Sequence, residues 1–209
     1  ANIAFEDVDL SLFKSFPQAH VTIDKLSIIN KAPFAGDTLL YAGETNVTMS
    51  VKELFKGEGE TMSLESFSAV DGIVNIIFNK DGVANFDIAL KEAEEKKPSD
   101  SKPFALDIQK YGVENLKFSY IDEGSNMKMV LDSIYHEGKG NFAAQKLDLE
   151  TKTTAKLSFE MEKMNYMNNV GITLDAILGI DLEKSKYEFK DNKALINQLP
   201  LEFNGFIQM

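Results

Sequence analysis

The stretch Ala155-Lys156-Leu157-Ser158-Phe159-Glu160-Met161 alternates apolar and polar side chains at every step. Val47-Thr48-Met49-Ser50-Val51 shows the same alternation much earlier in the chain. Successive side chains of a β-strand point to opposite faces of its sheet, so this pattern predicts strands with one apolar face and one solvated face. Strands of that kind favour an antiparallel sheet over a parallel sheet that is covered on both faces.

Related patterns outside these two stretches predict most of the remaining strands. They cover residues 3–12, 20–29, 62–70, 73–79, 84–90, 104–120, 126–134, 140–149, 170–178, 180–190 and 201–208. Asn79-Lys80-Asp81-Gly82 and Asp122-Glu123-Gly124-Ser125 lie between apolar runs and are typical of hairpin turns. Residues 70–73 predict a turn or a bulge, and residues 51–56 one short helical turn. Residues 13–19 and 31–42 are expected to be loops.

A degenerate six-residue pattern recurs with the form apolar, acidic, any, apolar, any, apolar. The four copies are Phe5-Glu6-Asp7-Val8-Asp9-Leu10, Ile23-Asp24-Lys25-Leu26-Ser27-Ile28, Leu64-Glu65-Ser66-Phe67-Ser68-Ala69 and Val113-Glu114-Asn115-Leu116-Lys117-Phe118. The first two apolar positions are three residues apart, so a bulge is needed to keep both on one face. Repeated bulges would bend the sheet into a trough. The alternative is a coincidence among short, degenerate strings, since the copies are irregularly spaced.

The segment Lys91-Glu92-Ala93-Glu94-Glu95-Lys96-Lys97-Pro98-Ser99-Asp100-Ser101-Lys102-Pro103 differs in composition from its surroundings. It is charged and contains two prolines, which predicts a flexible loop. We therefore expect an N-terminal β section over residues 1–91, a loop over 92–103, and a second β section of the same continuous sheet over 104–209. The alternative is a linker between two separate domains. The predicted fold class is all-β: a long, curved, mainly antiparallel sheet that forms an apolar groove, with one short helix at most.

Composition excludes several classes of function. The net charge of the 209 residues is −11, and arginine is absent, so nucleic-acid binding is not expected. The chain has no cysteine and therefore no disulfide, thiol nucleophile or thiolate metal site. It begins at Ala1 and shows no signal peptide or membrane-spanning run, because its apolar runs are far shorter than the ~20 residues that cross a bilayer. We expect a fragment of a longer protein.

Sequence motifs for catalysis or metal binding are also missing. The histidines His20 and His136 have no ligand-like neighbour two or four residues away, and no G-x-S-x-G elbow, P-loop or G-x-G-x-x-G occurs. Asp81-Gly82 and Asp122-Glu123-Gly124 lack the alternating oxygen ligands of an EF-hand and are better explained as turns. No cofactor, metal or catalytic residue is expected, and we predict that the chain is not an enzyme. A carbohydrate-active β protein stays open as a further alternative, although the absence of tryptophan disfavours it.

Apolar residues on the predicted strands are the candidate functional residues. They are Val8, Leu10, Leu12, Leu26, Ile28, Val47, Met49, Val74, Ile76, Leu116, Phe118, Leu157 and Phe159. Two interpretations are open at this point: the stripe is the core of a closed sandwich or barrel, or it lines an open groove that holds an apolar ligand. The chain predicts no amphipathic helix long enough to cover a sheet, so either the sheet folds on itself or something else covers the stripe.

The sequence resembles the periplasmic part of AsmA-family proteins of the Gram-negative envelope. The resemblance begins at residues 5–13 with Phe16-Pro17 and continues through 21–28, 32–40 and 47–57. It is most specific at Gly72-Ile73-Val74-Asn75-Ile76-Ile77-Phe78-Asn79-Lys80-Asp81-Gly82-Val83-Ala84-Asn85-Phe86-Asp87-Ile88, which is similar to the family's pattern of a strand, an Asp-Gly turn, an asparagine, an aromatic residue and an aspartate. Residues 113–122 resemble the opening of the next sheet section. The membrane helix that family members usually carry at the N-terminus is missing.

The resemblance implies a repeating β-groove with an apolar floor that binds and conducts lipid. It implies a role in outer-membrane biogenesis and in phospholipid transport between the inner and outer membranes. The expected partners are phospholipid or another acyl lipid, the inner membrane through a segment absent from this chain, and envelope proteins. The expected location is the periplasm, with the full-length protein anchored to the inner membrane. The alternative is an assembly or scaffold module for outer-membrane proteins that binds no lipid.

Overall fold

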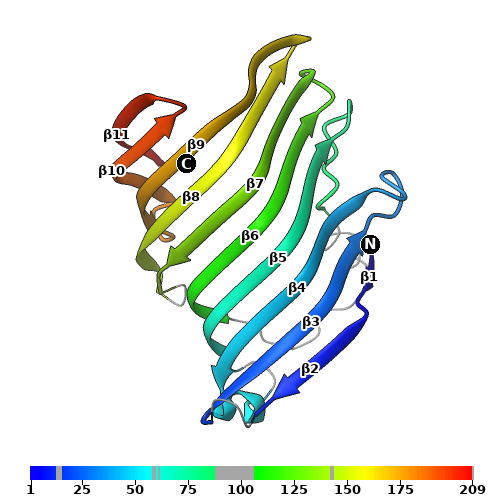
Figure 1. The fold of residues 1–209 in the computed structure, drawn as a ribbon, viewed down its shortest axis with the longest axis vertical. Coiled ribbons are helices and arrows are strands. Elements are labelled where there is room, and N and C mark those ends of the chain that lie inside the picture. Colours follow the sequence, from blue (N-terminus) through cyan, green and yellow to red (C-terminus); the bar gives the residue numbers. More distant parts are fainter. Residues whose placement is uncertain (13–15, 58–59, 61, 88–105, 142–143, 209) are drawn as a thin grey trace.

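The computed structural model describes residues 1–12, 16–57, 60, 62–87, 106–141 and 144–208. These residues form one open, strongly twisted sheet of eleven strands, and they contain one 3₁₀ helix and no α-helix (Figure 1). The all-β class predicted from the sequence is confirmed. The strands are β1 (Asn2–Ala4), β2 (Asp7–Ser11), β3 (Gln18–Ile29), β4 (Thr38–Ser50), β5 (Met62–Phe78), β6 (Leu106–Asp122), β7 (Met127–Lys139), β8 (Lys146–Met161), β9 (Met164–Asp181), β10 (Lys186–Ile196) and β11 (Leu199–Gln208).

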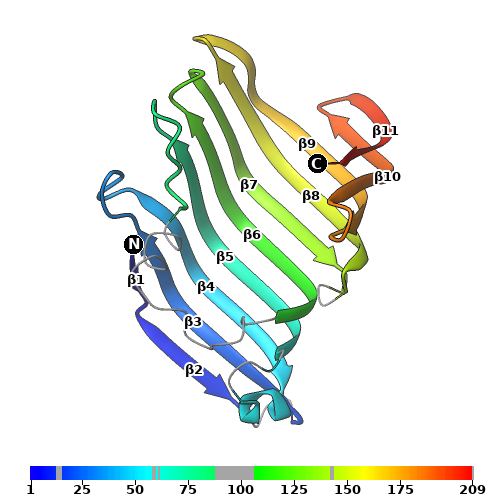
Figure 2. The ribbon, with the colours of Figure 1, turned by 180° about the vertical axis from the view of Figure 1, so that it is seen from behind.

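The strands lie in the sheet almost in the order of the chain. From β3 to β11 each strand pairs with the next, and both β1 and β2 pair with β3 at the first edge. All pairs are antiparallel except β5 and β6, which run side by side in parallel (Figure 2). The sheet does not close on itself, so β11 forms its second edge, where it pairs with β10 alone among the described strands.

Several predicted boundaries differ from the structure. Residues 3–12 form two strands because the chain breaks at Phe5 and Glu6, whereas 62–70 and 73–79 belong to the single strand β5. Residues 84–87 do not continue a strand, because only Ala84 bridges to Phe78 before the described segment ends. The helical turn expected over 51–56 is the 3₁₀ helix η1 (Val51–Phe55). The loop expected over 92–103 lies outside the described residues.

A buried asparagine pair holds the turn that follows β5. Gly82, with φ +74°, closes the predicted Asp-Gly turn through a bond from its N–H to the carbonyl of Asn79. Asn85, only 2% exposed, then donates from Nδ2 to the carbonyl of Asn75 and accepts from the N–H of Ile77. Asn30 donates to the backbone carbonyl of Asn85 at 2.7 Å. The loop before β4 and the turn after β5 are therefore fixed together at one end of the sheet.

Candidate functional site

Strand β8 defines the two faces of the sheet. No residue of β8 has a positive φ, so its side chains alternate without interruption. One face of β8 therefore carries the residues Leu147, Leu149, Thr151, Thr153, Ala155, Leu157, Phe159 and Met161. We call this the apolar face. The opposite face carries charged and polar residues such as Lys152, Thr154 and Lys156 and is called the outer face.

Strand β7 keeps its apolar side chains on the same face only by breaking its alternation. His136 pairs with Thr153 and Leu131 pairs with Leu157, so both lie on the apolar face. They are five residues apart, however, and regular alternation would place them on opposite faces. Ser133 lies between them with φ +50°, in the left-handed region, and the register to β8 shifts at this point. The left-handed residue thus switches which side chains point to the apolar face.

The same switch occurs on most other strands. Left-handed residues lie at Lys25 in β3, Asp71 in β5, Asn115 in β6, Asn169 in β9 and Asp191 in β10. In each of β3, β5 and β6, odd-numbered residues point to the apolar face just before this position and even-numbered residues point to it afterwards. Strand β4 has Gly43 between Lys25 and Asp71 in the register. Lys25, Gly43, Asp71, Asn115 and Ser133 lie at neighbouring positions of the register and form a row across the sheet, which we call the switch row. Asn169 and Asp191 lie away from this row, Asn169 beside Ser158 and Asp191 between the pairs Lys190–Ile177 and Lys193–Asp175.

The switch row places all the predicted groove residues on the apolar face. Through the strand pairing, Ile28, Val74 and Phe118 share one line with Leu157, and Ile76 shares the next line with Phe159. On the other side of the row, pairing aligns the remaining predicted strand residues, namely Val8, Leu10, Val47 and Met49. Leu26 and Leu116 each lie two residues before Ile28 and Phe118, respectively, and therefore on the same face. Leu12 lies just after β2 and packs against a cluster of Ala19, Met49 and Leu64.

Burial is concentrated on the apolar face. Its buried apolar strand residues are Ala19, Ala42, Met49, Leu64, Ile134, Leu149, Ala155 and Ala176. The described residues place no helix or second sheet against it. Side chains on a flat, uncovered sheet remain exposed, whereas side chains on a concave surface cover one another. The burial shows that the side chains of the apolar face pack against one another.

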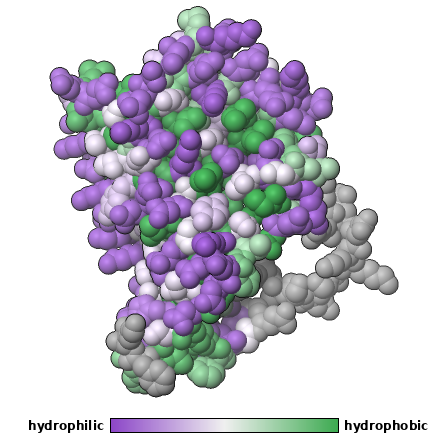
Figure 3. Space-filling model, turned by 45° about the vertical axis from the view of Figure 1, so that its right-hand side comes forward, coloured by the Kyte–Doolittle hydropathy of each residue, from purple (hydrophilic) through white to green (hydrophobic). Residues whose placement is uncertain are grey.

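Hydrophobic side chains also collect at one end of the strands. Figure 3 shows hydrophilic side chains over most of the visible surface and a hydrophobic group near the lower end, where Figure 1 draws η1 and the start of β3. The exposed residues there include Leu10, Phe16, Leu54 and Phe55, of which Phe55 is 82% exposed. The buried cluster of Ala19, Met49 and Leu64 lies at this end of the strands, and the partly buried Leu12 and Val51 pack against it.

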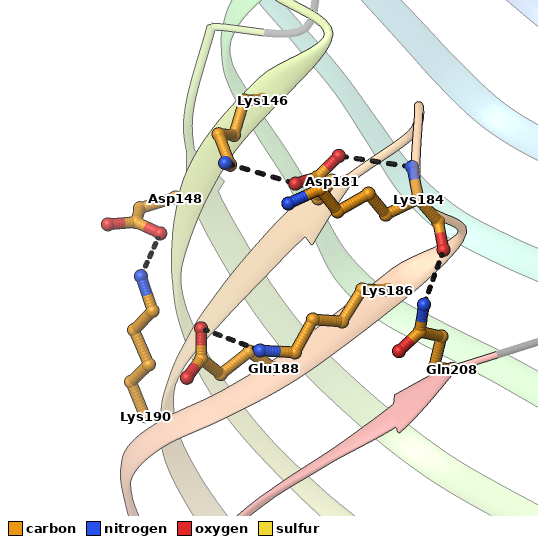
Figure 4. A network of polar contacts seen from close by, with 8 residues as sticks. All are labelled: Lys146, Asp148, Asp181, Lys184, Lys186, Glu188, Lys190 and Gln208. Carbon is orange, nitrogen blue, oxygen red and sulfur yellow. Dashed lines mark hydrogen bonds and ion pairs between the residues drawn. The ribbon is translucent and has the colours of Figure 1, made fainter.

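The ends of β8 to β11 form a polar rim beside the trough (Figure 4). Asp181, the last residue of β9, accepts from Lys146 Nζ at 3.0 Å and from the backbone N–H of Lys184. These hydrogen bonds hold the pKa of Asp181 below its ordinary value. Lys190 donates to Asp148 at 2.6 Å on the outer face, and the bond raises the pKa of Lys190. Strand pairing places these ion pairs on the outer face, at one end of β8 to β10.

A few polar side chains interrupt the apolar face near the switch row. Tyr111, His136 and Thr153 come from β6, β7 and β8 and are linked by hydrogen bonds. Sequence reasoning missed this group, because 25 residues separate Tyr111 from His136 and no local spacing brings them together. Thr45, 3% exposed, lies on the same cross-strand line as His136 and Thr153.

One hollow of the described residues lies on the outer face. It has a volume of about 880 Å³ and is lined by residues that include Thr154, Lys156, Thr173 and Asn197.

Among the described residues, no group of three or more histidine, aspartate or glutamate side chains is arranged to hold a metal ion. The apolar face is therefore the stronger candidate site.

No helix within the described part of the chain has the length and apolar character needed to span a membrane. Comparison with known proteins found no matching family model, no matching curated protein and no matching solved structure.

Proposed function

We propose that this chain binds acyl lipid along its apolar face and acts as a lipid-transfer module, as its resemblance to the AsmA family implies. The observation that supports the proposal is the switch row. Six strands carry a left-handed residue within the sheet, and apolar side chains remain on one face on both sides of these positions. A chain that needed only a solvated sheet would gain nothing from keeping that face apolar across so many breaks in alternation.

The physical chemistry of the face suits an acyl chain. Burying each CH₂ of the ligand gains about 0.8 kcal/mol, so a continuous apolar floor can offset the cost of leaving a bilayer. A lipid headgroup would remain in water at the open edge of the trough. Both edges of the sheet are open, so an acyl chain could move from strand to strand without crossing a wall.

The envelope setting of this function also belongs to the proposal. By resemblance, the chain would act in the periplasm, in a protein anchored to the inner membrane. It would carry phospholipid between the inner and outer membranes and support outer-membrane biogenesis. A trough of this kind would be one part of a longer bridge.

The first test is extraction of the purified whole chain with organic solvent, followed by mass spectrometry. Phospholipid or another acyl lipid in a fixed molar ratio to protein supports the proposal. A clean extract from natively purified protein, together with failure to take up lipid from vesicles, contradicts it.

The second test places a charge on the apolar face. Leu26→Glu and Phe159→Glu should expel lipid while the protein remains folded, because a carboxylate beside acyl chains is strongly disfavoured but can still reach water in an open trough. Thr154→Glu is the matched control, since Thr154 lies on the outer face of the same strand as Phe159 and should leave bound lipid unchanged. Global unfolding of both variants would instead indicate a closed core, and folded variants with normal lipid would exclude these positions from the floor.

A scaffold module that binds no lipid is the second candidate, and β11 is the observation that favours it. Every residue of β11 is exposed, including Leu199, Phe203 and Ile207, and one edge of its backbone has no described partner. Unprotected edge strands pair readily with strands of other proteins. A lipid-free extract and a tightly bound envelope protein that is lost when β11 is disrupted would support this alternative.

A further inference from the structure

A hydrogen-bonded group of three side chains lies within the apolar face. The Nε2 atom of His136 is 2.9 Å from the hydroxyl oxygen of Tyr111, and its Nδ1 atom is 2.8 Å from the Oγ1 atom of Thr153. The rings of Tyr111 and His136 are also in contact, with centroids 5.2 Å apart. Tyr111 covers Gly138, where any side chain would collide with its ring. The imidazole is therefore held at both nitrogens, across three strands.

Among the described residues, the neighbours of His136 on the apolar face carry no compensating charge. Tyr111 is the one titratable group that faces it from β6, and β8 presents Thr151, Thr153 and Ala155 there. The charged residues of these strands nearest to His136 stand at the alternate positions, on the outer face. They are Lys110, Glu114, Glu137 and Lys152. Burial lowers the pKa of His136, with only a weaker opposing effect from Glu137. Burial likewise raises the pKa of the Tyr111 hydroxyl, which keeps that group neutral.

The two partners can accommodate either protonation state of the imidazole. Neutral histidine has one N–H donor and one acceptor nitrogen, whereas the imidazolium has two donors. Both partners are hydroxyl groups, and each hydroxyl oxygen can donate or accept. Protonation thus requires only rotation of a hydroxyl hydrogen, and no hydrogen bond is lost. The cost of the charge comes from its surroundings and not from broken contacts.

We infer that His136 makes ligand retention in the trough pH-dependent, so that an uncharged apolar ligand is held while His136 is neutral and is released when His136 takes up a proton. The inference rests on the proposed lipid-binding function. A ligand that covers the imidazole excludes water from it and disfavours the charged form. Because linkage is reciprocal, protonation must weaken binding of that ligand by the same factor.

The experiment measures binding of N-phenyl-1-naphthylamine, an uncharged dye that fluoresces in apolar surroundings, to the whole chain between pH 7.5 and 5. The dissociation constant should rise as the pH falls, by about tenfold if the ligand lowers the titration midpoint of His136 by one pH unit. His136→Gln should lose the pH dependence of the dissociation constant, whatever its affinity at pH 7.5. His20→Gln is the matched control, because His20 lies on the outer face and bonds to Thr48 there.

Two further measurements separate the outcomes. Tyr111→Phe retains the titrating imidazole and should keep a pH-dependent affinity, and circular dichroism at each pH establishes that every variant is folded. Absence of dye binding at all pH values, together with absence of lipid in the extract, would refute the proposed function itself. Binding that does not change with pH, or that changes equally in His136→Gln, would overturn the role of His136 and leave lipid binding intact. A rise in affinity on acidification would also overturn it.

Discussion

Asn115 donates from Nδ2 to Oδ1 of Asp71 at 2.5 Å, and both residues adopt the left-handed conformation at the same level of neighbouring strands. The bond joins two members of the switch row across the parallel pair β5–β6. Asparagine and aspartate tolerate this conformation better than most residues, because their short polar side chains can form local hydrogen bonds. The row is therefore stabilised where the parallel pairing interrupts the antiparallel sheet.

The switch at Ser133 gives the first prediction. Ser133→Gly should leave the free energy of unfolding unchanged or raise it by about 1 kcal/mol, because glycine reaches positive φ without strain. Ser133→Val should lower it by about 1–3 kcal/mol, because a β-branched residue is strongly disfavoured there. Urea unfolding followed by circular dichroism measures both changes. The exposed strand residue Thr154, which has no positive φ, should respond in the opposite order, with glycine the more harmful substitution.

Part of the switch row was predictable from the sequence, because the recurring pattern required a bulge. At Ile23-Asp24-Lys25-Leu26 and Val113-Glu114-Asn115-Leu116 the structure has left-handed Lys25 and Asn115, and at Leu64-Glu65-Ser66 the register to β4 shifts. At the first copy the chain instead breaks between β1 and β2. Ser133 and Asp191 follow no such pattern, and only the pairing with β8 and β9 reveals their role.

Contacts between distant strands were not predictable. The sequence placed the apolar residues on strands because alternation is a local property, and those residues do share one face. The parallel pairing of β5 with β6 depends on the path of the intervening chain, which periodicity does not encode. The group around His136 depends on the exact register of three strands, so His136 looked isolated in the sequence.

The buried amide of Asn85 gives a second prediction. Asn85→Leu keeps a similar volume but leaves the N–H of Ile77 and the carbonyl of Asn75 without their side-chain partner. The side-chain oxygen of Asn30 also loses the hydrogen bond that it accepts from Asn85. Each unsatisfied buried group costs about 1–3 kcal/mol, so the loss should reach at least ~2 kcal/mol in urea unfolding. Asp87→Asn, an exposed change two residues away, should have little effect. An Asn85→Leu protein as stable as the unmodified chain would show that the turn is held by other contacts.

The rim gives a prediction for acid stability. Hydrogen bonds from Lys146 and from the backbone of Lys184 lower the pKa of Asp181 in the folded chain. The resulting stabilisation is fully present above the ordinary carboxyl pKa of about 4 and is lost as the pH falls through the lower, folded value. Asp181→Asn should therefore be less stable than the unmodified chain at pH 6, and this difference should shrink at pH 3. Asp175→Asn, on the outer face of the same strand, should show no such convergence in thermal unfolding.

Gly138 gives the last prediction, because it tests how Tyr111 shields His136. A side chain at Gly138 would meet three atoms of the Tyr111 ring, so Gly138→Ala must displace the ring and separate its hydroxyl from His136. We expect a loss of about 1–3 kcal/mol and a rise in the titration midpoint of His136, measured by NMR, as water reaches the imidazole.

At Gly72 a new methyl group would collide with the side-chain end of Leu116, which can rotate, and would lie 3.3 Å from the backbone oxygen of Tyr41. Gly72→Ala should therefore cost less than Gly138→Ala. The decisive comparison introduces Gly138→Ala into the Tyr111→Ala protein. There the substitution should have almost no effect on stability, because the ring is gone, and the double-mutant cycle measures this coupling. If Gly138→Ala costs the same with and without the ring, the strain arises from the backbone of β7, and Tyr111 is not what Gly138 accommodates.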